Sequence, residues 1–510
     1  MFFYASIAVA ESSSTAVSSQ TFHLKKISFL GVTNEKELKQ LQKIASPYLD
    51  KNVTIESVTQ LKKELAHYYK SRGMLFRKVV LLPQDLSDGV LQFSIIKTKV
   101  GKININGNKY YSKAFILRNL AFSEGGYLYY NAMLESLLLL NSYEDLSIKS
   151  YLKKGEKFAT TDVYLDVKDT FPFHATVTFD NLGSKNISKS RVSVDSSYGN
   201  LINDGDKISS KVTFGIDSLK SDRTKLLLLN YETTPLGRYF TRLHMGYLYA
   251  DYITAGDLSV LELKGDTYKY SIGLSQPLFY TATTQIKSDL DYARKHIKSY
   301  LLGSLSSDDE IGMVSLSLSL EHKRVFDGVR SQLSVIKGIS GDDSQSSRYG
   351  AKMKFLKFTF KSSYNRYINK NFSLFLSLDG QYSHNRLPLS ELYTIGGLSS
   401  VRGYEPAQKL GDSGYLTTAE TFFHPELNYF SWLKNALQIG VYADYARVYN
   451  KRPVAGEEKA SSLAAVGGEL LMNLDKRYFA RISVGYPLYA SDKTINDSTH
   501  LYGYVGIKLW

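Results

Sequence analysis

From Thr170 to the end of the chain, apolar residues alternate with small or polar ones at a period of two. The clearest runs lie at 171–179, 314–320 and 374–378, and none of them carries helical spacing. Such alternation is typical of strands that present one face to an apolar environment and the other to water. The last two-thirds of the chain are therefore predicted to be antiparallel β structure, either one closed barrel or a soluble sandwich.

The apolar content of the chain favours a barrel in a membrane. No apolar run of about 18 residues occurs, so we expect no membrane-spanning helix, and membrane residence then requires a closed barrel. The chain has 39 Tyr and 25 Phe, and aromatic girdles mark both interfaces of such barrels. At roughly 20 residues per strand and connection, residues 170–510 suit about sixteen strands of about 9 to 11 residues.

Connections within this region can also be predicted. Two alternating runs, Phe355–Tyr367 and Phe372–Tyr382, are separated by the short polar segment 368–371, which is typical of a hairpin turn. Longer polar segments at 340–347 and 453–462 are expected to be outer loops. The chain ends inside its last predicted strand, as suits a barrel whose last strand pairs with its first.

The first part of the chain has a different pattern. Residues 22–98 predict a strand, two helices around 38–49 and 58–68, and two further strands. The same order recurs in residues 99–169. Two related α+β modules in tandem are therefore expected before a barrel domain at 170–510.

The N-terminus resembles the end of an exported protein's leader. Residues 1–10 are apolar and small and finish with Ala8-Val9-Ala10, so we interpret them as the remnant of a signal peptide and residues 11–21 as a short linker. A helix across a ~30 Å membrane needs about 20 residues. The linker is too short for one, so no N-terminal helix is expected to plug a pore.

Charge and cysteine content restrict the partners. The net charge of +14 comes from Lys and Arg spread through every segment, which argues against nucleic-acid binding and allows a positively lined pore or contact with acidic lipid. The sequence has no cysteine, so disulfides, cysteine zinc sites and thiol nucleophiles are excluded.

Enzymatic motifs are equally scarce. Gly411-Asp412-Ser413-Gly414 is similar to the nucleophile segment of trypsin-like proteases, but Tyr415 follows it and no histidine motif precedes it. There is no HExxH motif, no phosphate-binding P-loop and no GxSxG elbow. The carboxylate pairs Asp308-Asp309 and Asp342-Asp343 are expected in solvated loops rather than as calcium ligands. We predict no catalytic residue, no metal and no cofactor.

Several motifs together resemble one family. They are Leu82-Pro83-Gln84-Asp85-Leu86-Ser87-Asp88-Gly89, Asn106-Gly107-Asn108, Asp180-Asn181-Leu182-Gly183 and Val401-Arg402-Gly403-Tyr404. In this combination the chain resembles two-partner secretion transporters of the TpsB type, to which filamentous haemagglutinin and haemolysin exporters belong. The resemblance covers nearly all of residues 22–510. It implies an outer-membrane barrel preceded by two periplasmic POTRA domains, with Leu82, Pro83, Gln84, Asp85 and Gly89 as the signature of the first.

The resemblance also implies a gating loop. In the family the segment that corresponds to Val401, Arg402, Gly403 and Tyr404 folds back into the barrel, and its arginine pairs with an aspartate of an aromatic-x-Asp-x-Gly strand. Here Tyr442 and Asp444 match that motif, while Ala446 replaces the usual glycine. A guanidinium in a lumen prefers a bidentate carboxylate. The alternative is an exposed arginine without a fixed partner.

The implied function is type V protein transport: export of a large haemolysin, adhesin or contact-dependent toxin from the periplasm to the cell surface. The implied partners are this exoprotein, recognised by the POTRA domains, the outer-membrane lipid, and the assembly machinery through the C-terminal strand that ends at Trp510. A barrel-assembly insertase of the same superfamily, which usually has about three to five POTRA domains, is one alternative. A passive porin or adhesin is the other.

Overall fold

A computed structural model describes residues 21–217, 224–237, 239–254, 256–426, 436–475, 477–492 and 498–509. The predicted signal peptide, most of the linker and Trp510 therefore lie outside the described residues. The chain divides into two compact units, and the second contains residues 107–120 and 135–148 together with everything from Val167 onward. No helix among the described residues has both the length and the apolar character needed to cross a membrane.

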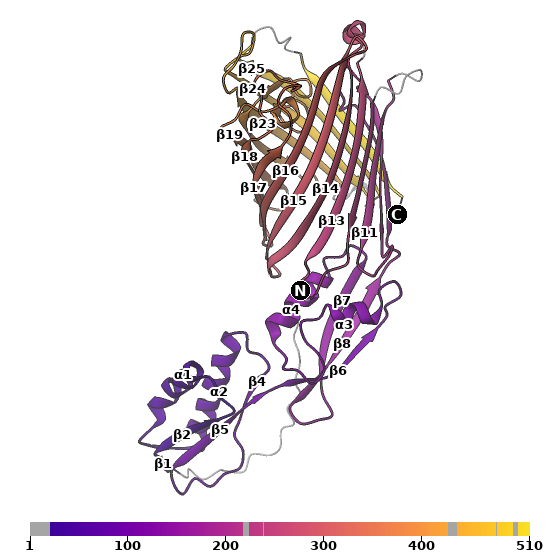
Figure 1. The fold of residues 1–510 in the computed structure, drawn as a ribbon. Helices are drawn as coiled ribbons and strands as arrows, with labels where there is room; N and C mark the ends of the chain where they lie inside the picture. Colours follow the sequence, from indigo (N-terminus) through magenta and orange to yellow (C-terminus); the bar gives the residue numbers. More distant parts are fainter. Residues whose placement is uncertain are drawn as a thin grey trace. The chain divides into compact units, whose positions relative to one another are not determined.

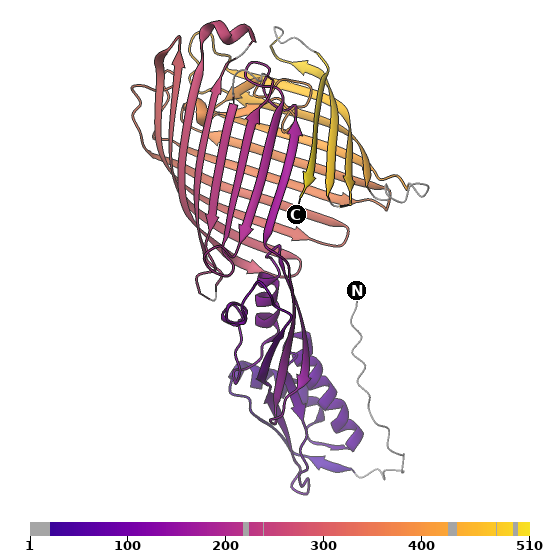
Figure 2. The same ribbon diagram turned by 90° about the vertical axis from the view of Figure 1, so that its right-hand side faces the viewer.

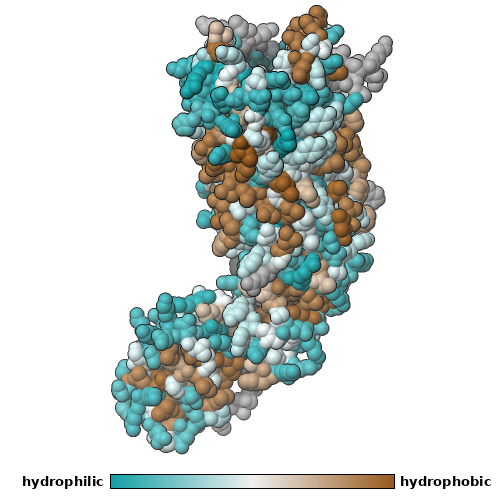
Figure 3. All heavy atoms as spheres, viewed as in Figure 1, coloured by the Kyte–Doolittle hydropathy of each residue, from teal (hydrophilic) through white to brown (hydrophobic). Residues whose placement is uncertain are grey.

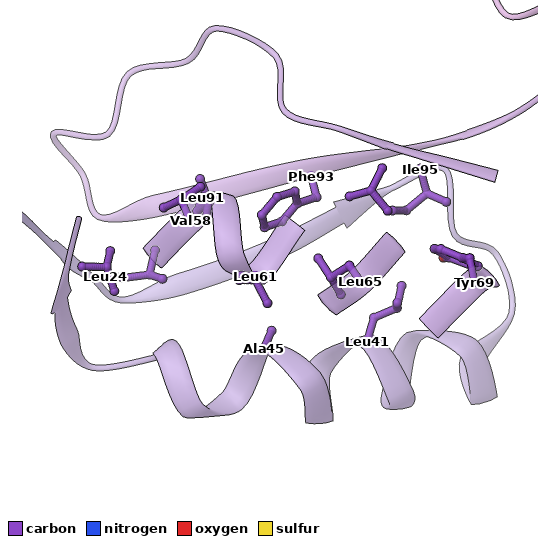
Figure 4. Close-up of a cluster of buried hydrophobic side chains, with 12 residues drawn as sticks. Leu24, Leu41, Ala45, Val58, Leu61, Leu65, Tyr69, Leu91, Phe93 and Ile95 are labelled. Atoms are coloured by element: carbon purple, nitrogen blue, oxygen red, sulfur yellow. The ribbon is translucent and has the colours of Figure 1, made fainter. Parts of the chain in front are cut away.

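The first α+β module contains the predicted strand, two helices and two final strands, with two additional short strands, β1 and β3, that pair with each other (Figure 1). Its elements are β1 (Phe22–Leu24), β2 (Lys26–Leu30), α1 (Glu35–Ala45), η1 (Ser46–Tyr48), β3 (Lys51–Val53), α2 (Ile55–Ser71), β4 (Arg77–Val80) and β5 (Val90–Lys97). Asn34 and Thr54 cap the two α-helices by accepting backbone hydrogen bonds through their side-chain oxygens. Leu41, Leu61 and Phe93 are fully buried between these helices and the β2-β5-β4 sheet (Figure 4).

The second module contains a three-stranded sheet and two helices. Its elements are β6 (Lys99–Asn106), α3 (Lys113–Arg118), α4 (Tyr130–Leu140), β7 (Leu146–Lys154) and β8 (Thr160–Asp169). The sheet has the order β6-β8-β7, and β6 and β8 run parallel. The elements match those predicted for residues 99–169, although α3 and the second half of α4 cluster with the barrel residues.

The rest of the chain forms a closed antiparallel barrel of sixteen described strands (Figures 1 and 2). They are β9 (Phe173–Asp180), β10 (Arg191–Gly199), β11 (Lys207–Gly215), β12 (Thr224–Glu232), β13 (Arg242–Ile253), β14 (Lys264–Tyr280), β15 (Thr284–Leu301), β16 (Ser304–Lys323), β17 (Asp327–Ser340), β18 (Leu356–Tyr367), β19 (Phe372–Ser383), β22 (Ser413–Phe423), β23 (Leu437–Tyr449), β24 (Ala460–Leu474), β25 (Tyr478–Ala490) and β26 (His500–Lys508). β26 pairs with β9, so the last strand closes the barrel as predicted. The predicted hairpin at 355–382 is also confirmed as β18 and β19.

The wall has an apolar outside and a polar inside, as the alternation predicts. On β16, Leu316 and Leu318 are 55% and 48% exposed, whereas Ser317 between them is 8% exposed and shares a hydrogen bond with Ser334. Apolar side chains cover much of the visible wall, and hydrophilic ones gather at the end that carries the long loops (Figure 3). The alternation therefore separates a lipid-facing surface from a lumen.

Two sequence-based expectations about this wall were wrong. Strands β14, β15 and β16 have 17, 18 and 20 residues, longer than the predicted 9 to 11. Their backbone pairing continues past the length needed to cross lipid. Asp308 and Asp309 consequently lie within β16 and not in a loop, and Asp309, which is 1% exposed, accepts hydrogen bonds from the backbone and the hydroxyl of Ser347.

Candidate functional site inside the barrel

The connection between β19 and β22 folds into the barrel. This segment, residues 384–412, is called the inward loop; it contains the short helix η3 (Leu389–Glu391) and a hairpin of β20 (Tyr393–Ile395) and β21 (Lys409–Gly411). Val401 and Tyr404 near its apex are 0% and 1% exposed. They belong to an apolar cluster with Ile395, Leu416, Ala446, Val448, Leu463 and Ala465. The apex is thus packed against the inner wall of β22–β24.

Arg402 at the apex is 2% exposed and contacts Asp444 on β23. Its Nε and Nη2 atoms donate to the two carboxylate oxygens of Asp444, each at 2.7 Å, and its backbone N–H donates to Oδ2 at 3.1 Å. This is the bidentate geometry in which a guanidinium binds a carboxylate most strongly. The Thr418 hydroxyl donates to Asp444 as well, at 3.0 Å. The arginine therefore has a fixed partner, unlike in the alternative of an exposed loop residue.

Two further carboxylates reach the same guanidinium. Nη1 of Arg402 donates to Oε1 of Glu420 at 2.5 Å and to Oε2 of Glu469 at 3.2 Å. Arg481 on β25 donates to Glu469 at 2.6 Å. The site, which we call the Arg402 anchor, thus combines three carboxylates with two arginines. Removing Arg402 would leave more negative charge buried than Arg481 alone can compensate.

The ring of Tyr442 packs against the face of the Arg402 guanidinium. The guanidinium carbon of Arg402 lies 3.3 Å from the centroid of the Tyr442 ring, a close cation–π contact. The hydroxyl of Tyr442 donates to the backbone carbonyl of Val484 at 3.0 Å. Both residues of the predicted wall motif, Tyr442 and Asp444, therefore contact the arginine. Sequence reasoning missed Glu420 and Glu469, although both lie at inward positions of strands that flank β23.

Glycines allow the apex to touch the wall directly. A Cβ on Gly485 of β25 would lie 2.5 Å from the backbone N of Gly403. Gly403 itself has a φ of +110°, which residues with a side chain rarely adopt. Its backbone N–H donates to the Tyr502 hydroxyl at 3.2 Å, and the Tyr404 hydroxyl donates to the carbonyl of Tyr489 at 2.8 Å. Backbone and side chains of the apex are both held.

The lumen beside the inward loop is hollow. A cavity of about 630 Å³ is lined by β15–β19 on one side and by Ser399 and Leu416 on the other. Short hydroxyl side chains and exposed ion pairs form its wall. Lys361 pairs with Asp379 at 3.2 Å, and Arg330 pairs with Glu321 at 3.0 Å. A polar chain would meet no large apolar side chain over most of this wall.

The opposite end of the barrel is fixed to parts of the second module that belong to the same compact unit. Nε2 of His174, at the start of β9, lies 2.8 Å from Oδ1 of Asp145. The backbone N–H of Ser112 donates to Asp204 in the β10–β11 turn at 3.0 Å. Arg242 lies over the Tyr143 ring at 4.6 Å. These contacts place Ser112, Tyr143 and Asp145 of the second module at the end of the barrel where β9 begins and where the β10–β11 turn lies.

The signature of the first module has a structural role in its sheet. The side chain of Gln84 donates to the carbonyl of Gln92 at 3.0 Å and accepts its N–H at 2.7 Å, so it pairs with β5 beyond the end of β4. Asp85 accepts the N–H of Ser87 at 2.9 Å. Gly89 has a φ of +72°, and a Cβ there would lie 2.5 Å from the carbonyl oxygen of His23. Leu82 and Pro83 precede this turn.

The protease-like segment is part of the barrel wall. The Ser413 hydroxyl accepts the backbone N–H of Ser383 at 3.0 Å, in the β19–β22 pair, and is buried. Asp412 binds Arg348 and backbone groups rather than a histidine. Among the described residues no group of three His, Asp or Glu side chains is placed to hold a metal ion.

Comparisons with known proteins agree with this architecture. The sequence model of the haemolysin secretion/activation protein ShlB/FhaC/HecB family matches residues 159–470, and that of the ShlB-type POTRA domain matches residues 22–98. The heme/hemopexin transporter protein HuxB of Haemophilus influenzae is 23% identical over 502 residues, which cover 94% of this chain and 85% of HuxB.

Solved structures show the same fold. CdiB from Escherichia coli superposes with a TM-score of 0.79 at 18% identity, covering 98% of this chain and 93% of that one. BamA from Haemophilus ducreyi lacking POTRA domains 1–3 superposes with a TM-score of 0.58 at 14% identity, covering 96% and 100%. The barrel and at least part of the N-terminal region thus have known structural counterparts.

Proposed function

Because the chain belongs to the haemolysin secretion/activation ShlB/FhaC/HecB family, we propose that it exports its partner exoprotein past the inward loop, with the Arg402 anchor as the gate. It is an outer-membrane transporter of the two-partner secretion type, with its POTRA region in the periplasm. The observation that carries the gate is the burial of Arg402 inside the barrel, where three carboxylates and an aromatic ring bind it.

The contacts of the inward loop define its resting position. All polar atoms of the Arg402 side chain bind the wall, so the loop has one well-defined seat. The cavity beside it provides polar space for a chain in transit. Displacement of Val401–Tyr404 would widen this space into a passage for the polypeptide. Folding of the exoprotein at the cell surface would then give the movement its direction.

The exoprotein is captured, in this proposal, by strand addition to the first module. Among the described residues, no strand pairs with the outer edge of β2 or of β4, because β5 is the central strand of the β2-β5-β4 sheet. The side chain of Gln84 already makes hydrogen bonds with the N–H and carbonyl groups of Gln92 on β5, so these two groups are not available to a client strand. Backbone pairing at an open edge gives affinity with little dependence on sequence, as an unfolded client requires.

A groove next to β4 adds apolar and cationic contacts to this edge. It has a volume of about 210 Å³ and is lined by residues 72–77 at the start of β4, by 97–98, and by 127–131. Met74 and Leu75 in it are 36% and 45% exposed, and Arg72 gives it positive charge, whereas Arg77 is paired with Glu37. An extended client segment with aromatic or acidic side chains suits such a lining.

Other roles fit the observations less well. An assembly insertase shares the barrel fold, as the BamA likeness illustrates, but this chain has two α+β modules where insertases usually have more. A passive porin would have no use for a loop that is bound so extensively. We also infer that the protein performs no covalent chemistry, because Ser413 serves the β19–β22 pairing. Assembly into the membrane through the last strand and Trp510 remains part of the proposal.

Replacing Arg402 tests the gate. Arg402→Ala should abolish secretion of the exoprotein encoded with this transporter while heat-modifiable barrel still accumulates in the outer membrane. Deletion of the loop segment Val401–Tyr404 should do the same. The matched control is Arg294→Ala, because Arg294 is an exposed arginine on β15 that pairs with Glu310. Secretion from the Arg402→Ala variant at the level of the control would refute the gate.

A further inference from the structure

A second buried charge network lies at the outer end of the barrel. It begins at Asp412, where the inward loop returns to β22, and Asp412 is 0% exposed. Its Oδ1 atom accepts the backbone N–H of Leu387 at 2.6 Å and Nη1 of Arg348 at 2.8 Å. Its Oδ2 atom accepts the backbone N–H of Lys451 at 2.7 Å. One carboxylate therefore joins three surface segments, namely 341–355, the inward loop and 450–459.

Glu457 makes the second half of this network. Its carboxylate binds Arg386 through two parallel hydrogen bonds, of 2.7 and 2.6 Å, and accepts Nε of Arg348 at 3.1 Å. Arg348 and Arg386 are each 6% exposed. The hydrogen bonds from Arg386 hold the pKa of Glu457 at about 2, so the carboxylate stays ionised at any pH outside strong acid. The four charged side chains thus compensate one another.

Two of the three segments start far apart on the barrel wall. Segment 341–355 connects β17 to β18, and segment 450–459 connects β23 to β24, so the four strands β18, β19, β22 and β23 lie between the midpoints of the two segments. Neighbouring strands are about 4.8 Å apart, so the midpoints of the two segments are separated by roughly 19 Å along the wall. Direct contact between Arg348 and Glu457 at 3.1 Å requires both segments to lean toward each other over the barrel.

This network is independent of the Arg402 anchor. The two clusters share no residue, and they hold different parts of the inward loop. Arg402 fixes the apex, whereas Asp412 and Arg386 fix the two ends at which the loop leaves the wall. The inward loop is therefore attached twice, once inside the lumen and once at its mouth.

We propose that Arg348, Arg386, Asp412 and Glu457 form a mouth latch that holds the three surface segments together in the resting transporter and separates when the exoprotein emerges. These are positioning residues, since they act through the segments they join. A polypeptide that leaves the lumen has to pass the level of these segments, and extended strands with their side chains pack about 10 Å apart face to face. In the latch, the carboxylate of Asp412 accepts hydrogen bonds from all three segments, which gives this aspartate of the protease-like motif a structural role.

A reversible cross-link tests the separation. Because the chain has no cysteine, the double variant Arg386→Cys/Glu457→Cys carries the only two thiols. Cells that express the full-length transporter are treated with a short, reducible bifunctional thiol reagent, and secretion of the partner exoprotein is followed before and after addition of reductant. Export should fall roughly tenfold when the segments are tied and recover on reduction. Unchanged export across a complete cross-link would overturn the proposal.

Conductance tests the resting role. Asp412→Asn keeps the shape of the side chain but removes its charge and turns one hydrogen-bond acceptor into a donor that faces other donors. In planar bilayers, the purified variant should show a larger or noisier resting conductance than the wild type. The control is Lys352→Gln, which removes an exposed ion pair with Asp343 from the same segment. Equal conductance of Asp412→Asn and the control would overturn the resting role.

The two experiments separate the latch from the gate. The cross-linking experiment leaves Arg402 and its three carboxylates intact, so a failed gate proposal would not alter its result. Should Asp412→Asn not reach the membrane, Glu457→Gln replaces it, because Glu457 is 25% exposed and its loss leaves the contacts of Asp412 in place. Equal conductance of Glu457→Gln and the control would then count against the latch.

Discussion

Two arcs of the barrel wall differ in what they present to the lumen. The arc β22–β26 binds the inward loop through the Arg402 anchor, an apolar cluster and direct backbone contact at Gly485. The arc β15–β19 borders the cavity with short hydroxyl side chains and with ion pairs whose cations are largely exposed. Both arcs follow the same period-two pattern in sequence, so the pattern alone does not distinguish them.

The difference lies in how the charges are paired. On the loop-binding arc, Asp444 and Glu469 have fully buried side chains, and a lost partner there would cost about 3 to 5 kcal/mol. On the cavity arc, Lys361 is 68% exposed in its side chain, and such a pair contributes about 0 to 1 kcal/mol. One arc is built to hold a protein segment in place, and the other can meet a moving chain without binding it tightly.

Apart from the loss of Arg402 itself, the largest expected effect comes from adding a methyl group to the loop-binding arc. Gly485→Ala would place a Cβ 2.5 Å from the backbone of Gly403, and neither atom belongs to a flexible side chain. The apex must then leave its seat and weaken the Arg402 pairs, so export should fall roughly a hundredfold. The measurement is the amount of secreted exoprotein per folded barrel in the outer membrane.

Gly468→Ala on β24 is the control for this change. A Cβ there would have only the carbonyl oxygen of Gly440 nearby, at 3.7 Å, which is ordinary contact. It should export like the wild type. Equal export from the two alanine variants would show that the direct contact between loop and wall has no role in transport.

A smaller effect is expected when the charge at residue 402 is kept but its geometry is lost. Arg402→Lys retains one positive charge, yet an ammonium cannot make two parallel hydrogen bonds to Asp444 while it also reaches Glu420. Export should fall roughly tenfold, between Arg402→Ala and the wild type. Side-by-side secretion assays of the three proteins give the order, and Arg402→Lys with full export would mean that charge alone is sufficient.

The features of the two arcs that depend on local sequence patterns could be predicted, whereas those that depend on strand register could not. The strand alternation, the hairpin at 355–382 and the segment Val401–Tyr404 are local patterns, and the contact between Arg402 and Asp444 followed from motifs known in the family. Glu420 and Glu469 were missed because their approach to Arg402 depends on the register of β22, β23 and β24, which no local pattern specifies.

The same reason accounts for the errors at the outer end. A polar stretch such as that around Asp308 has the composition of a loop, but backbone pairing with β15 keeps it in a strand. The burial of Asp412 likewise depends on segments that are more than 20 residues away on either side, namely those of Arg348 and Lys451. Ala446 in place of glycine adds a methyl group to the apolar cluster around Val401, so the departure from the family motif fits the packing.

Narrowing the cavity arc should have a moderate effect. Ser377→Trp on β19 would fill part of the cavity opposite Ser399 without touching the Arg402 anchor. Export should fall about threefold because side-chain volume replaces passage volume. The outward-facing neighbour gives the control, since Leu376 is 40% exposed and Leu376→Trp adds an aromatic group to the lipid side. A full rate with Ser377→Trp would place the route of the exoprotein elsewhere in the lumen.

The smallest effect is expected for an exposed ion pair of the cavity arc. Lys361→Gln removes the partner of Asp379, but water already reaches both side chains, so the free energy of the barrel should change by less than about 1 kcal/mol. Export should stay within about twofold of the wild type for the same reason. Urea-dependent unfolding in detergent and the secretion assay measure the two quantities. A loss of export as large as that of Arg402→Lys, with unchanged stability, would show that the cavity arc binds the passing chain through Lys361. The two arcs would then differ in what they bind, the inward loop or the exoprotein, and not in how strongly they bind it.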